Sequence, residues 1–419
     1  MRFWPLVGFL VASLYARVAH SQLPVSELAP CAVACDQTVL SLSGCARADM
    51  RCLCESKTYN KNFEACTKQT CSVKNLLVAY RVREITCEIP ARNEGDTTKH
   101  ASWALFAIVL VAVVARFVFR APSVSGSGYG ADDHTIALAF LLMIPLSVIT
   151  HELTRMGLGR DIWRLPFENI TNIMYSYWVG QFLYVWIMSM TKISILSLYL
   201  RVWIADPIVR RDWFRLACSG MIIILASYAV VMSLTLGFEC NPINFTWLRW
   251  DGEHEGTCID LNAHGLALAA FNTVQDLIIC LLPLPKLFTF DLSLRDKLIV
   301  GTMFSVGLFL TSCSIIRLQY VIQLDTTDNL TFAYNPVCLW STIECGVTII
   351  CACLPSVVGL VQHAYGYKLS AQELIDRASC LTERKAGPNQ PWHELESPVL
   401  GRDMVRIKGP FVREISEWD

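Results

Sequence analysis

The chain has 419 residues, of which 53% are hydrophobic and only 17% are charged, and its formal net charge is −1. Soluble globular chains are about 25% charged, so this composition excludes an ordinary soluble protein and indicates a membrane protein. The net charge says nothing about nucleic-acid binding, and no basic run suggests it, so we expect no nucleic-acid partner. The sequence contains no P-loop, nucleophile elbow or HExxH helix, and we therefore expect no enzymatic activity.

Residues 1–21 have the pattern of a secretory signal peptide. Arg2 precedes an apolar run over residues 3–18, and the small residues Ala19 and Ser21 precede the expected cleavage point. A signal anchor that is retained is the alternative. We expect cleavage, because the cysteine-rich segment that follows is typical of the oxidising exterior.

Residues 22–95 are predicted to form a small domain held together by disulfide bonds. A segment of this length buries too little apolar surface to be stable alone, and cross-links would restrict its unfolded state. Spacing alone does not give the connectivity. A zinc site at Cys52 and Cys54 is the alternative, which export and the lack of a CxxC motif disfavour. The segment contains eight cysteines: Cys31, Cys35, Cys45, Cys52, Cys54, Cys66, Cys71 and Cys87.

The spacing of these cysteines, with Pro30 before the first and Asp49 before the Cys-x-Cys pair, resembles the fungal CFEM domain. The resemblance covers the whole segment and implies a compact helical fold. It also implies four nested disulfide bonds: Cys31–Cys71, Cys35–Cys66, Cys45–Cys52 and Cys54–Cys87.

Asp49 is the candidate metal-binding residue of this domain. In some CFEM domains the equivalent aspartate is an axial ligand of haem iron, so the resemblance makes haem a candidate cofactor. A carboxylate favours ferric over ferrous iron, which would couple release of haem to reduction. Alternatively, Asp49 is a turn residue or a helix cap. The aromatic residues available for a haem platform are few: Tyr59, Phe63 and Tyr80.

A polar linker over residues 88–99 leads into seven apolar segments that are long enough to span a hydrocarbon core of ~30 Å. Membrane helices tolerate the prolines that three of them contain. We expect seven membrane-spanning helices over residues 96–362, near 101–119, 134–152, 176–200, 214–237, 263–285, 299–321 and 337–360.

Two features indicate a plasma-membrane topology with an extracellular N-terminus and a cytoplasmic C-terminus. The loops 120–133, 201–213 and 286–298 and the tail hold more arginine and lysine than the opposite loops, a modest bias of the kind expected for the cytoplasmic side. The glycosylation sequons at Asn169, Asn244 and Asn329 all lie in the opposite loops. Cys240 and Cys258 share one of these outer loops, where they could pair.

Four ionisable residues are predicted inside the spans, where charge is costly and usually functional. Lys192 and Asp276 both lie roughly 12–14 Å from the inner ends of the third and fifth spans, so they are a plausible pair. Arg317 and Glu344 each lie a short distance from the outer ends of the sixth and seventh spans and are a second candidate pair. Alternatively, each charge lines a wet cavity or reaches the interface separately.

Short motifs recur along residues 100–362: Gly157-Leu158-Gly159, Lys192-Ile193-Ser194, Cys240-Asn241-Pro242, Asp276, Pro283, Pro285, Arg317, Trp340 and Glu344. They resemble the fungal rhodopsin-like seven-helix family. A CFEM domain joined to such a bundle is the arrangement of a fungal receptor class associated with surface sensing and pathogenicity. The seventh span has no lysine for a retinal Schiff base, which argues against light sensing. Leu200-Arg201 stands where an Asp-Arg-Tyr motif is usual, so conventional G-protein coupling is in doubt.

Residues 363–419 are polar and are expected to form a mostly disordered cytosolic tail, helical over 370–385. It is a docking or phosphorylation segment or simply a solvated end. The predicted fold is therefore all-α: a disulfide-stapled helical ectodomain, a seven-helix membrane bundle and a tail. We expect a cell-surface receptor that senses external or host cues during infection through its CFEM ectodomain. Its partners would be the membrane, an extracellular ligand or host surface protein and, as a candidate, a G protein. Alternatives are a membrane-anchored haem or iron acquisition protein and a virulence effector that suppresses host immunity.

Overall fold

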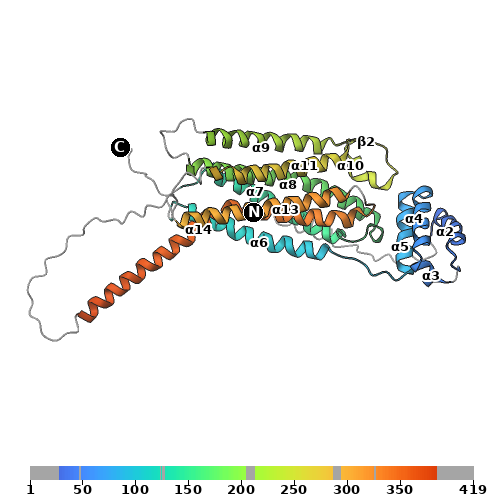
Figure 1. Ribbon diagram of the computed structural model, residues 1–419, viewed down its shortest axis with the longest axis horizontal. Coiled ribbons are helices and arrows are strands. Elements are labelled where there is room, and N and C mark those ends of the chain that lie inside the picture. The colour runs from blue at the N-terminus through green and yellow to red at the C-terminus, as the bar shows by residue number, and fades with distance from the viewer. Residues whose placement is uncertain are drawn as a thin grey trace, which may run out of the picture.

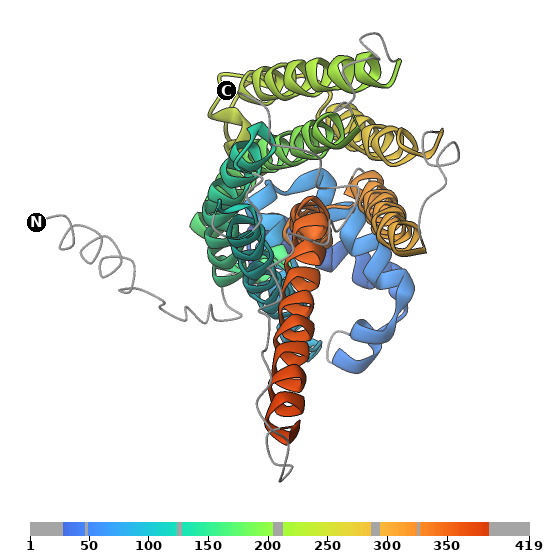
Figure 2. The ribbon, with the colours of Figure 1, turned by 90° about the vertical axis from the view of Figure 1, so that its left-hand side faces the viewer.

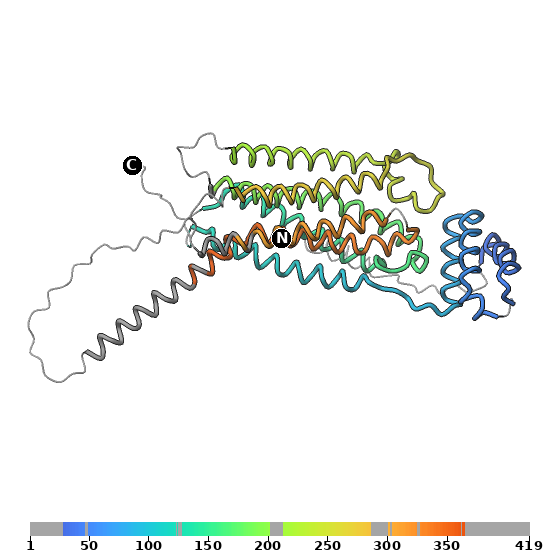
Figure 3. The backbone as a smooth tube through the Cα atoms, viewed as in Figure 1, coloured from blue at the N-terminus to red at the C-terminus, as the bar shows by residue number. Residues whose placement is uncertain are grey.

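The computed structural model describes residues 28–46, 49–122, 124, 128–203, 213–285, 294–324 and 327–384. The predicted signal peptide and the tail beyond residue 384 lie outside these ranges (grey in Figure 3). The described residues form a small helical domain at one end of a bundle of long helices (Figure 1). We call this domain the ectodomain, this end of the bundle its outer end and the opposite end its inner end, after the topology that the sequence predicts. The predicted all-α fold is confirmed.

Four helices make up the ectodomain: α2 (Pro30–Ser43), α3 (Met50–Glu55), α4 (Lys57–Thr70) and α5 (Val73–Thr86). The hydroxyls of Ser56 and Ser72 cap α4 and α5 by accepting hydrogen bonds from backbone N–H groups three residues on. The core is small and centres on Val39, Tyr59 and Phe63. So few buried residues do not stabilise a domain alone, and the disulfide bonds therefore supply the remaining stability.

The ectodomain disulfides have the pairing that the CFEM resemblance implied. Cys31–Cys71 and Cys35–Cys66 join α2 to α4 and its C-terminal end, while Cys54–Cys87 joins α3 to the end of α5. Cys45–Cys52 closes the short loop before α3. Each helix of the ectodomain is thus linked covalently to another.

In the described part of the chain, seven helices are long and apolar enough to cross a membrane. They are α6 (Gly95–Arg120), α7 (Ala131–Met156), α8 (Phe167–Trp203), α9 (Trp213–Gly237), α11 (Leu261–Leu281), α13 (Leu294–Gln323) and α14 (Leu330–Arg384). Their packing is visible end-on in Figure 2. Within the apolar, membrane-spanning stretch of each helix, 61% of the residues are buried in α8 but only 22% in α9. Helix α8 is therefore central and α9 peripheral.

Most of these helices are longer than predicted, because they continue through polar residues that an apolar window excludes. Helix α11 is the exception, since it ends at Leu281 rather than near residue 285, just before Pro283. Helix α14 continues past the membrane span to Arg384, through the segment of the tail for which a helix was predicted.

Short elements close the outer end of the bundle: η2 (Ile162–Arg164), β1 (Cys240–Asn241), α10 (Phe245–Leu248), η3 (Arg249–Asp251) and β2 (Thr257–Cys258). Strands β1 and β2 pair antiparallel, and Cys240 and Cys258 are disulfide-bonded across the pair.

Gly159 has φ +88°, and a Cβ there would lie 2.5 Å from the nitrogen of Gly95. Only glycine allows α7 to turn this closely against the start of α6.

Candidate functional site

The four charges predicted inside the membrane form a single cluster in the centre of the bundle. The Nζ of Lys192 on α8 lies 3.0 Å from Oδ1 of Asp276 on α11. The Nε of Arg317 on α13 lies 3.2 Å from Oε2 of Glu344 on α14. The exposed fractions are 1% for Lys192, 8% for Asp276, 4% for Arg317 and 0% for Glu344. Two cations and two anions thus balance in a buried site.

Asn272 and Ser314 join the two ion pairs. The amide of Asn272 donates to Glu344 Oε1 at 2.6 Å and to Asp276 Oδ2 at 3.3 Å, while its Oδ1 accepts from Lys192 at 2.8 Å. The hydroxyl of Ser314 contacts both Asp276 and Glu344. Sequence reasoning missed both residues, because an uncharged polar residue in a membrane span is too common to stand out.

Because each member has several partners, the cluster is sensitive to the loss of any one. Breaking a buried ion pair by removing one partner typically costs about 3–5 kcal/mol. The cluster draws on α8, α11, α13 and α14 at once. A change in one ion pair would therefore alter contacts among all four helices.

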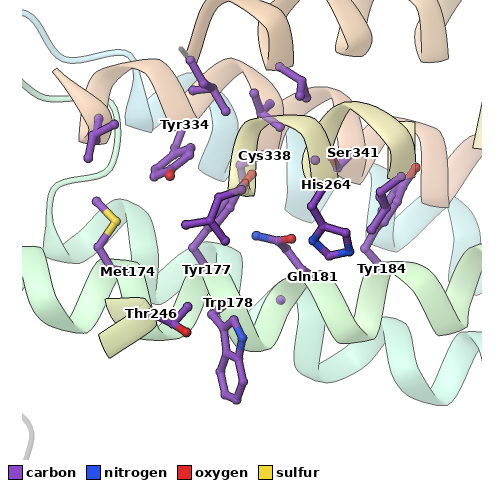
Figure 4. A pocket seen from close by; sticks show the side chains of 18 of the residues that line it. Met174, Tyr177, Trp178, Gln181, Tyr184, Thr246, His264, Tyr334, Cys338 and Ser341 are labelled. Carbon is purple, nitrogen blue, oxygen red and sulfur yellow. The ribbon is translucent and has the colours of Figure 1, made fainter. Parts of the chain in front are cut away.

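A cavity of about 610 Å³ lies between this cluster and the outer end of the bundle. This volume is within the range of about 300–1,000 Å³ that small-molecule sites usually have. Figure 4 shows Tyr334, Cys338 and Ser341 of α14 on one side and Tyr177, Gln181 and Tyr184 of α8 on the other, with His264 nearby. Helices α7, α11 and α13 and the loop between β1 and β2 complete its wall.

Arg317 and Tyr184 belong to both the cavity wall and the charge cluster. The hydroxyl of Tyr184 donates to Glu344 Oε2 at 2.8 Å, and its ring lies 4.6 Å from Cζ of Arg317. This is a cation–π contact inside the bundle. Tyr184 and Arg317 thus link the cavity directly to Glu344.

The loop between β1 and β2 forms the outer wall of the cavity. Phe245, Thr246, Arg249 and Trp250 of this loop line it. The indole of Trp250 also donates to Thr171 of α8 at 3.0 Å, which ties the loop to the bundle. The Cys240–Cys258 disulfide closes the base of the loop.

The ectodomain packs directly on the outer end of the bundle. Glu84 of α5 accepts hydrogen bonds from Arg164 Nε at 2.5 Å and from the Trp163 indole at 2.7 Å. Beside it, Tyr80 packs edge-on against Trp163 with 5.6 Å between ring centroids. Burial at this contact raises the pKa of the Tyr80 hydroxyl to about 12.

A second contact joins the ectodomain to the loop that lines the cavity. Lys74 of α5 lies 2.6 Å from Glu253 and 3.8 Å from Asp251. Asp251 ends η3 and directly follows Trp250 of the cavity wall. A movement of α5 would therefore shift this loop and change the shape of the cavity wall.

An ionic cluster at the inner end of the bundle was not predicted. Arg116 of α6 lies 2.6 Å from Asp132 and 2.8 Å from Asp133 of α7, and Arg120 and Arg201 contact the same carboxylates. Arg116 is fully buried. The predicted set of four intramembrane charges was incomplete, since Arg116 lies within the span predicted at 101–119. The location of Arg116 inside a predicted span and the adjacent aspartates Asp132 and Asp133 could have indicated this cluster from the sequence.

Asp49 caps α3, because its Oδ1 accepts a hydrogen bond from the Cys52 N–H at 3.0 Å. The aromatics that a haem platform would need are engaged elsewhere: Tyr59 and Phe63 lie in the ectodomain core, and Tyr80 packs on Trp163. Among the described residues, no group of three or more His, Cys, Asp or Glu side chains is placed to hold a metal ion. In this structure Asp49 is therefore a helix cap, and haem binding at this residue stays a prediction.

The three sequon asparagines differ in accessibility. Asn244 is exposed in the outer loop. The side chain of Asn169 donates to the Met156 carbonyl at 3.1 Å. Asn329 is engaged at both ends of its amide, since Nδ2 donates to Asp161 at 2.8 Å and Oδ1 accepts from the Ile162 N–H at 2.9 Å. A glycan on Asn329 would break these contacts.

Two family descriptions match the chain: Fungal rhodopsin domain over residues 97–363 and CFEM domain over residues 24–88. A SAT4 family membrane protein of Emericella nidulans is 32% identical over 55% of this chain and 56% of its own length. Fugralins biosynthesis cluster protein 2 of Gibberella zeae is 24% identical over 47% of this chain and 49% of its own. Receptor GIN3 of Arthrobotrys oligospora is 27% identical over 45% and 43%. The chain thus spans about half the length of these relatives, and no solved structure matches it.

Proposed function

Since the chain belongs to the fungal rhodopsin domain family and carries a CFEM domain, we propose that it is a cell-surface receptor. In this proposal the CFEM ectodomain and the cavity face the outside, and an external cue changes the packing of the seven helices. The similarity to a protein named Receptor GIN3 supports this assignment. The cue would be one met on a surface or a host during infection.

The observation that carries the proposal is a series of contacts from the ectodomain to the membrane interior. Lys74 holds Glu253 in the outer loop, the same loop lines the cavity, and Arg317 of the cavity wall faces Glu344. A domain that served only as a tethered binding module would not need such contacts. The direct packing therefore favours a receptor over an anchored acquisition protein or an effector that acts apart from its bundle.

The inner ionic cluster supports a cytoplasmic output. It joins α6, α7 and α8 through Arg116, Asp132 and Arg201. A rearrangement of these helices would expose or hide charged groups on the cytoplasmic side, where a G protein or another signalling protein would bind. Plasma-membrane location with an extracellular N-terminus follows from the same proposal.

The experiment is a complementation test in a deletion strain of the fungus. Wild-type protein should restore the cyclic-AMP or calcium response to surface or host cues, whereas Glu344→Gln should not. Lys99→Gln changes a partly exposed charge on α6, outside the buried clusters, and is the control, which should behave as wild type. Surface expression must be equal for all three proteins. An unchanged response in the deletion strain, or full function of Glu344→Gln, would overturn the proposal.

A further inference from the structure

Two residues in the wall of the cavity between α8, α13 and α14 carry buried polar atoms that have no hydrogen-bond partner among the described residues. They are Arg317 in the deep wall, at Nε and Nη2, and Thr246 in the outer loop, at its hydroxyl oxygen. Buried polar groups are nearly always hydrogen-bonded in folded proteins. Three such atoms on two residues of one cavity wall therefore indicate a ligand that would bond to them.

The charges in the cavity wall favour an anion. Arg317 and Arg249 line the cavity, while Glu239 is the acidic residue in its wall and faces His264 at 3.6 Å. A guanidinium keeps its charge at every accessible pH and binds carboxylates through its paired N–H groups. A cationic ligand would instead place its charge against Arg317 inside a low-dielectric site.

Glu344 does not depend on Arg317 for its partners. It accepts hydrogen bonds from Tyr184 at 2.8 Å and from Asn272 at 2.6 Å, and the hydroxyl of Ser314 also contacts it. Arg317 Nε lies 3.2 Å from a Glu344 oxygen, but neither Nε nor Nη2 makes a hydrogen bond within the described part of the chain. These two nitrogens could therefore donate to a second carboxylate.

The remainder of the cavity would bind an apolar body. Tyr177 and Tyr334 stack with 4.3 Å between ring centroids, and Trp250, Leu330 and Val337 also line it. Apolar walls with a few placed polar groups are typical of sites for small organic molecules.

We propose that the cavity binds an organic monoanion, a carboxylic acid with an aromatic or aliphatic body, whose carboxylate is held by Arg317. This deepens the receptor proposal and rests on it for its signalling consequence only. The bound carboxylate would draw Arg317 on α13 away from Glu344 on α14. Binding would thereby alter the charge cluster without entering it.

The test measures ligand binding to the purified full-length protein in nanodiscs. Two signals report binding: quenching of tryptophan fluorescence and a rise in the thermal unfolding temperature. The probes are matched pairs, each an aromatic or medium-chain aliphatic carboxylic acid together with its methyl ester. We expect at least one acid to bind at least tenfold more tightly than its ester. The two structural series separate aromatic ligands from fatty acids.

Three variants make the outcome specific. Arg317→Gln should abolish the preference for acid over ester, and Arg155→Gln, which removes an exposed arginine at the outer end, should leave it unchanged. Gly265→Leu should weaken binding of both forms while Arg317 stays intact, because a Cβ at Gly265 meets its nearest atom at 3.7 Å and the rest of the side chain would fill the cavity.

Equal affinity for acids and esters would overturn the proposal, as would an acid preference that survives Arg317→Gln. Binding of no acid by correctly folded protein would also overturn it. If Arg317→Gln does not fold, the acid-to-ester ratio of the wild type and the loss of binding in Gly265→Leu still decide the matter. Because these readouts need no signalling, a failed receptor test leaves the result interpretable.

Discussion

Glu84 of the ectodomain and Arg164 of the bundle are 80 residues apart in the chain, yet Oε2 and Nε lie 2.5 Å apart at the junction of the two domains. The side chain of Glu84 is only 9% exposed. A charge at such a site needs its partner, since an unpaired buried charge is strongly unfavourable. The junction therefore fixes how the ectodomain sits on the bundle.

Replacing Glu84 with Gln should loosen this junction. The change weakens the bonds to Arg164 and Trp163 and costs about 1–3 kcal/mol at a buried site. Hydrogen exchange should rise in the linker over residues 88–94 and in η2, while the disulfide-bonded core of the ectodomain stays protected. Glu55→Gln, at an exposed position of α3, is the matched control. Unchanged exchange in the Glu84 variant would contradict the assignment.

Removing one partner from the Lys192–Asp276 pair should destabilise the bundle by about 3–5 kcal/mol, because the other charge remains buried. We expect Lys192→Met to lower the thermal unfolding temperature measured in one detergent. The double variant Lys192→Met/Asp276→Leu should lose less than the two single changes added together. Lys99→Met breaks the exposed pair with Asp96 and should cost about 0–1 kcal/mol. Additive losses would mean that the two residues act separately.

Asn244 should be the main site of N-glycosylation. Its side chain is exposed, whereas the amide of Asn329 is bonded to Asp161 and Ile162. Asn244→Gln should therefore increase the electrophoretic mobility of the secreted-pathway protein, and glycosidase treatment should remove the difference. Asn329→Gln should leave mobility unchanged and lower stability. A mobility change in Asn329→Gln would show that this asparagine is modified.

Asp49→Ala should cost about 1 kcal/mol, the usual effect of losing a helix cap. The measurement is hydrogen exchange of the N–H groups at the start of α3. Titration of the full-length protein with ferric haem addresses the metal-binding prediction separately. A Soret shift that Asp49→Ala abolishes would support ligation, while an equal shift in both proteins would indicate binding elsewhere.

The sequence predicted the architecture well, because its strongest signals are physical ones. Apolar segments of membrane-spanning length and a cysteine-dense exported segment each permit few structures. The near-equal depths of Lys192 and Asp276 also sufficed to suggest a pair, and the structure places them 3.0 Å apart.

Features that depend on helix rotation could not be predicted in this way. Asn272 and Ser314 join the two ion pairs only because their helices turn them toward the same point. The inner cluster was missed because Asp132 was assigned to a loop, whereas α7 begins at Ala131 and carries it into the interior. Docking of the ectodomain depends on contacts between distant segments, such as Glu84 with Arg164, that have no local signal.

Helix α14 extends over 55 residues from Leu330 to Arg384, a length of about 80 Å at 1.5 Å per residue. Tyr334 lines the cavity near one end, Glu344 lies in the charge cluster, and the Ala352 carbonyl accepts a hydrogen bond from Arg116 of the inner cluster. A single helix, which contains Pro336 and Pro355, thus touches all three sites. A tilt or rotation imposed at its outer end would be transmitted to the inner cluster within one helix, without a contact between separate segments.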